Sequence, residues 1–207
     1  MKVTVIGSGN MGSALAKQIA KAGHSLVVTG RNSTKAKDLA QTLGATYRAT
    51  DAAQGADVVV LATPYNEALS ALRAAGGLQG KIVVDISNPL TPDFMGLTIG
   101  HSTSAAEQIQ KAFPEAKVVK AFNTVFAQVL AQGAKLHEAT VPVFFASDDA
   151  SAKETVKALI QSIGFSPIDA GPLKNARYLE PLAGLNIYLG YGAGCGTSIA
   201  PAWIGIG

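Results

Sequence analysis

The chain has 207 residues, of which 48% are hydrophobic and 15% are charged, and its formal net charge is +3 at pH 7. This length and composition suit one folded domain with at most a small appendage, and they exclude a disordered protein. The charge is too small to indicate nucleic-acid binding, and the single cysteine, Cys195, excludes an intrachain disulfide and a cysteine-based metal site.

Short runs rich in β-branched residues alternate with helical patterns along almost the whole chain. The runs predicted as strands are residues 2–6, 25–29, 45–49, 57–62, 81–86, 117–122 and 141–146, with a weaker one at 166–170. A last helical pattern covers residues 175–190. Several strand runs are continuously apolar, which is typical of parallel strands covered on both faces. The sequence therefore predicts an α/β fold of the Rossmann type, with a doubly wound and mostly parallel sheet.

The first predicted strand leads into a glycine-rich turn, Gly7-Ser8-Gly9-Asn10-Met11-Gly12, which opens a helix. A G-x-G-x-x-G motif in this context is typical of dinucleotide binding. Gly7 permits the tight turn, Gly9 lets the backbone approach a pyrophosphate, and Gly12 lets the helix pack closely on the strand. Because the free N–H groups of the first helical turn face a bound phosphate, we predict that residues 7–12 bind the cofactor pyrophosphate.

The second predicted strand ends in Thr29-Gly30-Arg31-Asn32-Ser33-Thr34-Lys35, with no acidic residue before Asp38. An NAD enzyme typically carries Asp or Glu here, and that carboxylate accepts hydrogen bonds from the ribose hydroxyls. Arg31 and Lys35 instead suit the 2′-phosphate of NADP, and Gly30 leaves room for it. Asn32, Ser33 or Thr34 would donate further hydrogen bonds. The sequence predicts NADP as the cofactor.

Three further predicted strands end in polar turns: Ala62-Thr63-Pro64-Tyr65, Ile86-Ser87-Asn88-Pro89 and Ala121-Phe122-Asn123-Thr124. Ligands of an open α/β sheet lie beyond the carboxyl ends of its strands. We therefore place these turns along the nicotinamide half of the cofactor. Thr63, Asn88 and Asn123 are candidates for hydrogen bonds to the ribose or carboxamide. A local turn or capping role is the alternative for each of them.

No catalytic residue and no metal site is assigned from the sequence. The acidic candidates Asp85, Glu67, Glu107 and Asp169 have no partner that the sequence identifies, and the three histidines lie far apart. Hydride transfer between two redox cofactors depends mainly on orientation, and it does not need protein acid–base chemistry as carbonyl reduction does. The sequence is therefore consistent with transfer to a second redox cofactor.

The end of the chain is uncharged from residue 181 to residue 207, but its glycines and Pro201 do not suit a transmembrane helix. We expect a tail that packs on its own domain or on a partner subunit. The domains predicted are an NADP-binding Rossmann domain, 1–172, and a short helical and glycine-rich C-terminal extension, 173–207. Because the first predicted strand begins at Lys2, we expect no leader peptide and a cytoplasmic location.

The chain resembles the F420-dependent NADP oxidoreductase family over almost its whole length. The resemblance rests on VIGSGNMGSALA (5–16), GRNSTKA (30–36), LATPYNEA (61–68) and VVDISNPL (83–90), and most specifically on residues 104–124 and DAGPLKNARYLEPLA (169–183). Archaeal members pass hydride between NADPH and a deazaflavin coenzyme. The family fold is a Rossmann domain with a small C-terminal extension, and members are often dimeric.

This resemblance implies roles for individual residues. Residues 8–11 would hold the pyrophosphate, Arg31 and Lys35 the 2′-phosphate, while Thr63, Asn123 and Ala127 would lie near the nicotinamide. Asn123 stands where archaeal members carry a histidine, and the tail 190–207 lacks the pattern that covers the deazaflavin. Ferric reductases of the six-transmembrane epithelial antigen type use a similar domain to feed a flavin. The acceptor is therefore left open between a deazaflavin and a flavin.

Taken together, these features predict an NADP(H)-dependent oxidoreductase that transfers hydride between NADPH and a deazaflavin or flavin-like acceptor. We expect a homodimer with no nucleic-acid or membrane partner. Two alternatives stay open, because a fold does not determine its chemistry. One is an NADPH-dependent reductase of a small carbonyl or imine substrate bound at a dimer interface. The other is a non-catalytic NADP sensor.

Overall fold

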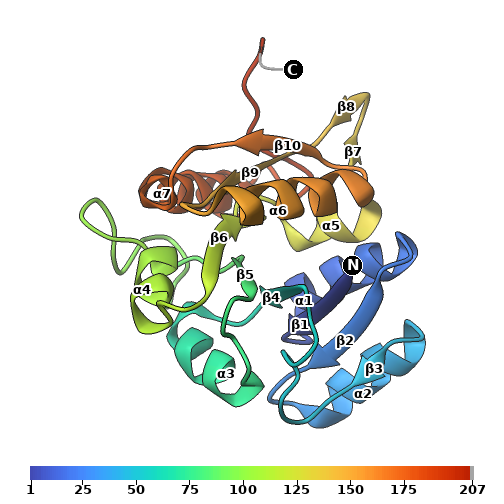
Figure 1. Ribbon diagram of the computed structural model, residues 1–207. Helices are drawn as coiled ribbons and strands as arrows, with labels where there is room; N and C mark the ends of the chain where they lie inside the picture. Colours follow the sequence, from blue (N-terminus) through green and yellow to red (C-terminus); the bar gives the residue numbers. More distant parts are fainter. Residues whose placement is uncertain (206–207) are drawn as a thin grey trace.

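Eight strands form one sheet in the order β10-β9-β6-β5-β4-β1-β2-β3 in the computed structural model, which describes residues 1–205 (Figure 1). The strands are β1 (Lys2–Ile6), β2 (Ser25–Thr29), β3 (Thr46–Tyr47), β4 (Val58–Leu61), β5 (Ile82–Asp85), β6 (Lys117–Ala121), β9 (Pro142–Ala146) and β10 (Ser166–Asp169). Neighbours in this sheet run parallel except β6 and β9, which are antiparallel. The predicted Rossmann-type, mostly parallel sheet is confirmed.

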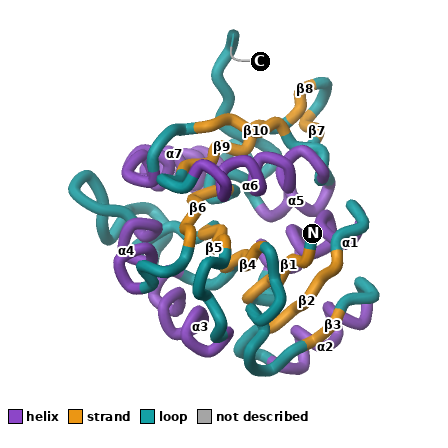
Figure 2. The backbone as a smooth tube through the Cα atoms, in the orientation of Figure 1, coloured by secondary structure: helices purple, strands orange, loops and turns teal. Residues whose placement is uncertain are grey.

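Helices cover both faces of this sheet (Figure 2). They are α1 (Asn10–Lys21), α2 (Ser33–Thr42), α3 (Ala68–Ala75), α4 (Ala105–Ala112), α5 (Ala127–Gln132), α6 (Ala150–Ser162) and α7 (Ala176–Ile187). Short helical turns η1 (Tyr65–Glu67) and η2 (Leu173–Asn175) precede α3 and α7, and a π-helical turn, η3 (Tyr188–Gly192), follows α7. The helix predicted at 175–190 therefore consists of two geometries.

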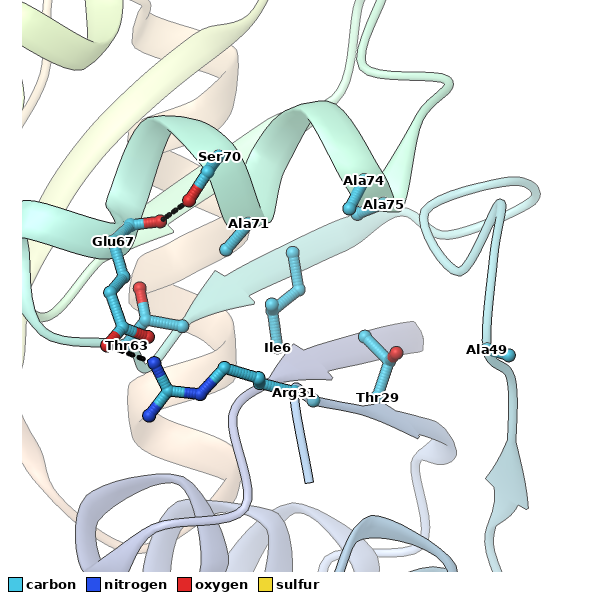
Figure 3. Close-up of a pocket in the computed structure, with 11 residues that line it drawn as sticks. Ile6, Thr29, Arg31, Ala49, Thr63, Glu67, Ser70, Ala71, Ala74 and Ala75 are labelled. Atoms are coloured by element: carbon cyan, nitrogen blue, oxygen red, sulfur yellow. Dashed lines mark hydrogen bonds and ion pairs between the residues drawn. The ribbon is translucent and has the colours of Figure 1, made fainter. Parts of the chain in front are cut away.

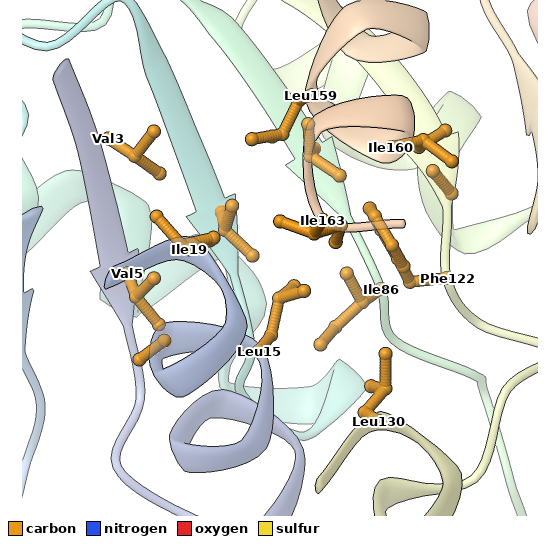
Figure 4. Packing of buried hydrophobic residues seen from close by; sticks show 14 of the residues in the cluster. Val3, Val5, Leu15, Ile19, Ile86, Phe122, Leu130, Leu159, Ile160 and Ile163 are labelled. Atoms are coloured by element: carbon orange, nitrogen blue, oxygen red, sulfur yellow. The ribbon is translucent and has the colours of Figure 1, made fainter. Parts of the chain in front are cut away.

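Alternate residues of the strands face two separate cores because strand side chains point to opposite faces in turn. Val3 and Val5 of β1 face a core that α1 and α6 fill with residues such as Leu15 and Leu159 (Figure 4). Ile6 faces the second core, which α3 and α4 cover. Burial on both faces explains the continuously apolar strand runs.

Side-chain caps fix the starts of two helices that border the site. The Asn32 side chain accepts a hydrogen bond from the Lys35 N–H at the start of α2, at 3.0 Å. At the start of α4, Ser104 Oγ accepts from the Glu107 N–H at 3.2 Å and donates to the Glu107 carboxylate at 2.8 Å. These contacts satisfy backbone N–H groups that a helix leaves unpaired at its first turn.

The structure shows three differences from the sequence-based elements. Residues 45–49 form only the two-residue strand β3, and β9 pairs antiparallel with β6. A separate antiparallel hairpin, β7 (Lys135–Leu136) and β8 (Ala139–Thr140), was not predicted. The hairpin lies outside the main sheet and is too short to give a periodic pattern.

The uncharged tail contacts its own domain at several points. The Trp203 ring meets the Phe144 ring edge to face, with centroids 5.3 Å apart, and Ile199 packs against the core beside α1. Over residues 1–205, no helix has the length and apolar character needed to cross a membrane. Packing on its own domain, one of the two arrangements expected, therefore accounts for part of the tail.

Candidate functional site

The glycine turn between β1 and α1 is closed by backbone packing at two of its glycines. A Cβ atom on Gly7, whose φ is +120°, would lie 2.3 Å from the Ala62 carbonyl oxygen, and one on Gly12 would lie 2.1 Å from the Gly7 carbonyl oxygen. At Gly9, by contrast, a Cβ would meet nothing within 4 Å. Gly7 and Gly12 therefore serve packing, and the backbone at Gly9 is left open to a ligand.

A pocket of about 300 Å³ lies between the carboxyl ends of β2 and β4 (Figure 3). Its walls are formed by small and apolar side chains, namely Ile6, Gly30, Ala49, Ala71, Ala74 and Ala75. Thr29 and Arg31 come from the β2 end, while Thr63 and Glu67 come from the segment after β4. Two strand ends that the sequence assigned to different halves of the cofactor thus border one pocket.

Arg31 extends across this pocket toward Glu67 (Figure 3). Its Nη1 atom donates to Glu67 Oε1 at 2.6 Å, and its side chain is 84% exposed. A guanidinium carries five N–H donors, so this contact leaves donors available for an anion. Lys35 lies in the first turn of α2, and the Asn32 side-chain oxygen is used as the helix cap. Arg31 is therefore the predicted phosphate ligand that faces the pocket.

The turns after β5 and β6 meet through two asparagines. Asn123 Nδ2 donates to Asn88 Oδ1 at 3.0 Å and to the Leu179 carbonyl oxygen at 2.9 Å. Asn88 Nδ2 donates in return to the Asn123 carbonyl oxygen at 2.9 Å. The structure therefore brings these predicted residues together, and their amide N–H groups bind the two turns to each other and to α7.

Four buried polar atoms near these turns have no hydrogen-bond partner within residues 1–205. They are Asn123 Oδ1 and the hydroxyl oxygens of Thr63, Ser87 and Thr124. They lie at the carboxyl ends of β4, β5 and β6, which are neighbours in the sheet. Buried polar groups in folded proteins nearly always have a partner. The arrangement therefore fits a bound ligand with both donors and acceptors, such as a nicotinamide carboxamide.

The remaining predicted residues lie around these features. Pro64 caps the turn η1, and Met11 packs against the core beside α1. Ala127 begins α5 and borders, with Asn10, a second and more open hollow of about 510 Å³ between α1, α2 and α5. Within residues 1–205, no three His, Cys, Asp or Glu side chains gather as a metal site requires.

A buried charged cluster lies beneath the β5 and β6 turns, and the sequence reasoning missed it. Lys120 Nζ is 2.7 Å from Asp85 Oδ2 and 2.9 Å from Glu180 Oε1, and all three side chains are at most 1% exposed. Burial opposes the charge on Lys120, but the two carboxylates outweigh it and raise its pKa. Burial raises the pKa of Glu180, and the Asp85 charge adds to this effect. Lys120 lies within the apolar strand run 117–122, and this position in the sequence could have indicated a buried lysine that needs acidic partners.

The acidic residues that the sequence left without partners are all ion-paired. Asp85 contacts Lys120, Glu67 contacts Arg31, Glu107 contacts Arg177 and Asp169 contacts Lys153, at 2.6–2.8 Å. The hydrogen bond from Arg177 holds the pKa of Glu107 below its usual value. The sequence did not identify these partners, because each lies 16 or more residues away in the chain.

Comparison with known proteins assigns the chain to a family. Residues 2–89 match the family described as NADP oxidoreductase, coenzyme F420-dependent. The F420-dependent NADP reductase of Methanocaldococcus jannaschii is 32% identical over 210 residues, which cover 90% of this chain and 93% of that protein. The chain belongs to the coenzyme F420-dependent NADP oxidoreductase family. The predicted family, and with it the class of NADP-dependent oxidoreductases, is confirmed.

Two further similarities extend this family assignment. A solved structure from Arthrobacter sp., of a protein proposed to be an F420-dependent NADP-reductase, matches with a TM-score of 0.87 and 33% identity, covering 98% of this chain and all of that one. Metalloreductase STEAP3 of Rattus norvegicus is 33% identical over 181 residues. That match covers 87% of this chain, which spans about a third of the metalloreductase (36%).

Proposed function

We propose that this member of the coenzyme F420-dependent NADP oxidoreductase family transfers hydride between NADPH and a flat redox coenzyme of the deazaflavin or flavin class. One observation carries the proposal. Along one edge of the sheet, a pocket bordered by the exposed guanidinium of Arg31 is followed by the open glycine turn. Beyond it lie three buried polar atoms, on Ser87, Asn123 and Thr124, that have no partner in the described residues. An NADP molecule has a phosphorylated adenosine, a pyrophosphate and a nicotinamide in the same order.

The adenosine half would lie in the pocket between β2 and β4. Arg31 would bind the 2′-phosphate through the donors that Glu67 leaves free, and Lys35 would add a point charge one helical turn away. The alanine walls would contact the adenine ring. A phosphate group suits this end of the pocket because the Arg31 guanidinium there is a cation.

The pyrophosphate would lie on the backbone at Gly9, where no side chain intervenes. The first N–H groups of α1 point toward that place, and the helix dipole favours negative charge there. α1 has no acidic residue in its first turn that would oppose the phosphates. Ser8 and Asn10 would border the pyrophosphate, as the sequence predicts.

The nicotinamide would lie beyond β4, β5 and β6. Its carboxamide carries both a donor and an acceptor, so its N–H would donate to Asn123 Oδ1 and its oxygen would accept from the Ser87 or Thr124 hydroxyl. When bound, NADPH supplies the hydride from this ring. The protein then supplies orientation, which is the main requirement for transfer between two redox cofactors.

The ion pairs described above favour a redox coenzyme over a carbonyl or imine substrate. Glu67 lines the pocket and Asp85 and Glu180 lie beneath the β5 and β6 turns, and each of these carboxylates is paired with a cation. A carbonyl reductase needs a proton donor at the substrate oxygen, whereas these carboxylates are engaged elsewhere. The names of the archaeal relatives, F420-dependent NADP reductases, support a deazaflavin. A flavin stays the alternative, which the resemblance found in the sequence left open.

The acceptor is tested by anaerobic NADPH oxidation with coenzyme F420, FMN or FAD added in turn, against a panel of small ketones and cyclic imines. We expect turnover with one of the three coenzymes and none with the panel. Turnover with the panel alone would support the substrate reductase, and tight NADPH binding without any turnover would support the sensor. From the sequence we further propose a cytoplasmic homodimer, whose mass light scattering measures.

A further inference from the structure

We propose that Glu180 of α7 is a positioning residue for the nicotinamide end, because through Lys120 it fixes the turn that follows β5, while the same helix holds the turn that follows β6. The inference rests on the proposed function, and it assigns the C-terminal extension a part in that function. It is carried by the contacts of the buried cluster and by the backbone of the turns above it.

The Ser87 backbone is held by this cluster on both sides. Lys120 Nζ donates to the Ser87 carbonyl oxygen, and the Ser87 N–H donates to Asp85 Oδ1 at 2.9 Å. Lys120 uses its other two donors on Asp85 and Glu180. All three ammonium protons are therefore engaged, and the hydroxyl is the polar group of Ser87 left without a partner in the described chain.

The charge of the cluster requires a third element, helix α4. Two carboxylates face one ammonium, so the cluster carries excess negative charge in a place without solvent. Glu180 Oε2 accepts from the Ala105 N–H at 3.0 Å, and Glu180 Oε1 accepts from the Ala106 N–H at 3.4 Å. The N-terminus of α4 thus stabilises the charge, because helix N-termini favour anions. Glu180 joins α7, α4 and β6 at one point.

The turn after β6 is strained and is held by α7. Phe122 is fully buried and has a φ of +61°, a left-handed conformation that is uncommon for a bulky residue. The next residue, Asn123, donates to the Leu179 carbonyl oxygen, and Asn186 Nδ2 donates to the Thr124 carbonyl oxygen at 3.1 Å. Strained residues persist only where their surroundings hold them, and such residues gather at functional sites.

These anchors affect one half of the proposed cofactor path only. Ser87, Asn123 and Thr124 carry the unpartnered atoms assigned to the nicotinamide, and each is held through Lys120 or α7. The residues assigned to the pyrophosphate lie between β1 and the first turn of α1, and those assigned to the adenosine phosphate follow β2. None of the hydrogen bonds of α7 given above reaches them. A change at Glu180 should therefore alter binding of the nicotinamide and leave the adenosine half unchanged.

The test compares two ligands in the Glu180→Gln variant of the full chain. NADPH carries both halves, whereas 2′,5′-ADP carries the phosphorylated adenosine without the nicotinamide. Glutamine keeps the size of Glu180, but it removes the charge and replaces one of the two acceptor oxygens with an NH₂ group. That group must face either the Ala105 N–H, or the Ala106 N–H and the Lys120 ammonium, all of which are donors. We expect the Kd for NADPH to rise about three- to tenfold, which corresponds to the loss of one or two neutral hydrogen bonds to the nicotinamide carboxamide. The Kd for 2′,5′-ADP should change less than about twofold.

Two further variants separate positioning from stability. Val156→Ala removes buried volume in α6, away from the site, and should lower the melting temperature without changing either Kd. Asn186→Ala removes the bond to Thr124 and should shift the ratio of the two Kd values in the same direction as Glu180→Gln. It also decides the matter if Glu180→Gln does not fold.

Two results would overturn the inference. Equal weakening of both ligands in Glu180→Gln would mean that Glu180 supports only the fold. Unchanged Kd values for both ligands in Glu180→Gln, or an unchanged ratio in Asn186→Ala if Glu180→Gln does not fold, would mean that α7 does not position the nicotinamide. Failure of the unaltered chain to bind 2′,5′-ADP would overturn the proposed function itself. The failures are therefore distinguishable.

Discussion

The two ends of the proposed cofactor path are built in opposite ways. At the adenosine end, the predicted phosphate ligand Arg31 is 84% exposed and belongs to one short run of sequence after β2. At the nicotinamide end, Ser87 and Asn123 are at most 6% exposed. Ser87 is fixed by a cluster whose members come from β5, β6 and α7, and Asn123 is fixed by Asn88 and by the Leu179 carbonyl of α7. A phosphate is recognised by its charge, which a solvated side chain supplies. Hydride transfer needs a fixed orientation, which requires packed surroundings.

The same contrast applies to the ion pairs. The exposed pair between Arg31 and Glu67 should contribute about 0–1 kcal/mol to stability. The buried cluster contains more carboxylate than ammonium charge, so loss of Lys120 would leave two carboxylates buried without their cation.

Lys120→Met should lower the free energy of unfolding by about 3–5 kcal/mol, because it leaves uncompensated buried charge. Urea denaturation at neutral pH measures the change. The matched control is Lys153→Met, which breaks the pair of Lys153 with Asp169 at the surface. It should cost less than about 1 kcal/mol. Equal effects of the two variants would contradict the contrast between a buried and an exposed ion pair.

The adenosine end could be predicted from the sequence because its features are local. The glycine motif and the run from Gly30 to Lys35 each lie within seven residues, and their backbone context follows from the strand and helix on either side. The sheet could be predicted for the same reason, since buried strands give continuous apolar runs. The boundaries of β3 and the direction of β9 depend on tertiary contacts, and there the sequence alone was insufficient.

The nicotinamide end could be predicted only in part. The sequence indicated Thr63, Asn88 and Asn123 because polar residues followed strands, and the structure places the two asparagines in contact. It did not indicate Glu180, which lies 60 residues from Lys120 in the chain and on a helix assigned to a separate extension. The proposed boundary at residue 172 stays a prediction. This boundary divides the sequence at residue 172, but the contacts of Glu180 with Lys120 and Ala105 join the residues on its two sides.

Arg31→Ala sharpens the comparison at the exposed end. Removing a charged donor should weaken NADPH binding by about 1.5–3 kcal/mol, because the 2′-phosphate loses its main cation. NADH has no such phosphate, so its binding should barely change. Isothermal titration calorimetry with both nucleotides measures the difference. If NADH binding weakened as much as NADPH binding, Arg31 would not be the residue that reads the phosphate.

Gly9→Ala tests the point where the two ends meet, with the smallest expected effect. The φ of Gly9 is −77° and a Cβ there meets no atom within 4 Å, so alanine fits the free chain and stability should change by less than about 1 kcal/mol. A bound pyrophosphate would meet that methyl group, and NADPH binding should weaken by about 1–2 kcal/mol, or five- to thirtyfold. Gly12→Ala is the control, because its Cβ would lie 2.1 Å from the Gly7 carbonyl oxygen and should lower stability before any ligand is added. Unchanged NADPH affinity in Gly9→Ala would mean that the pyrophosphate does not cross the glycine turn.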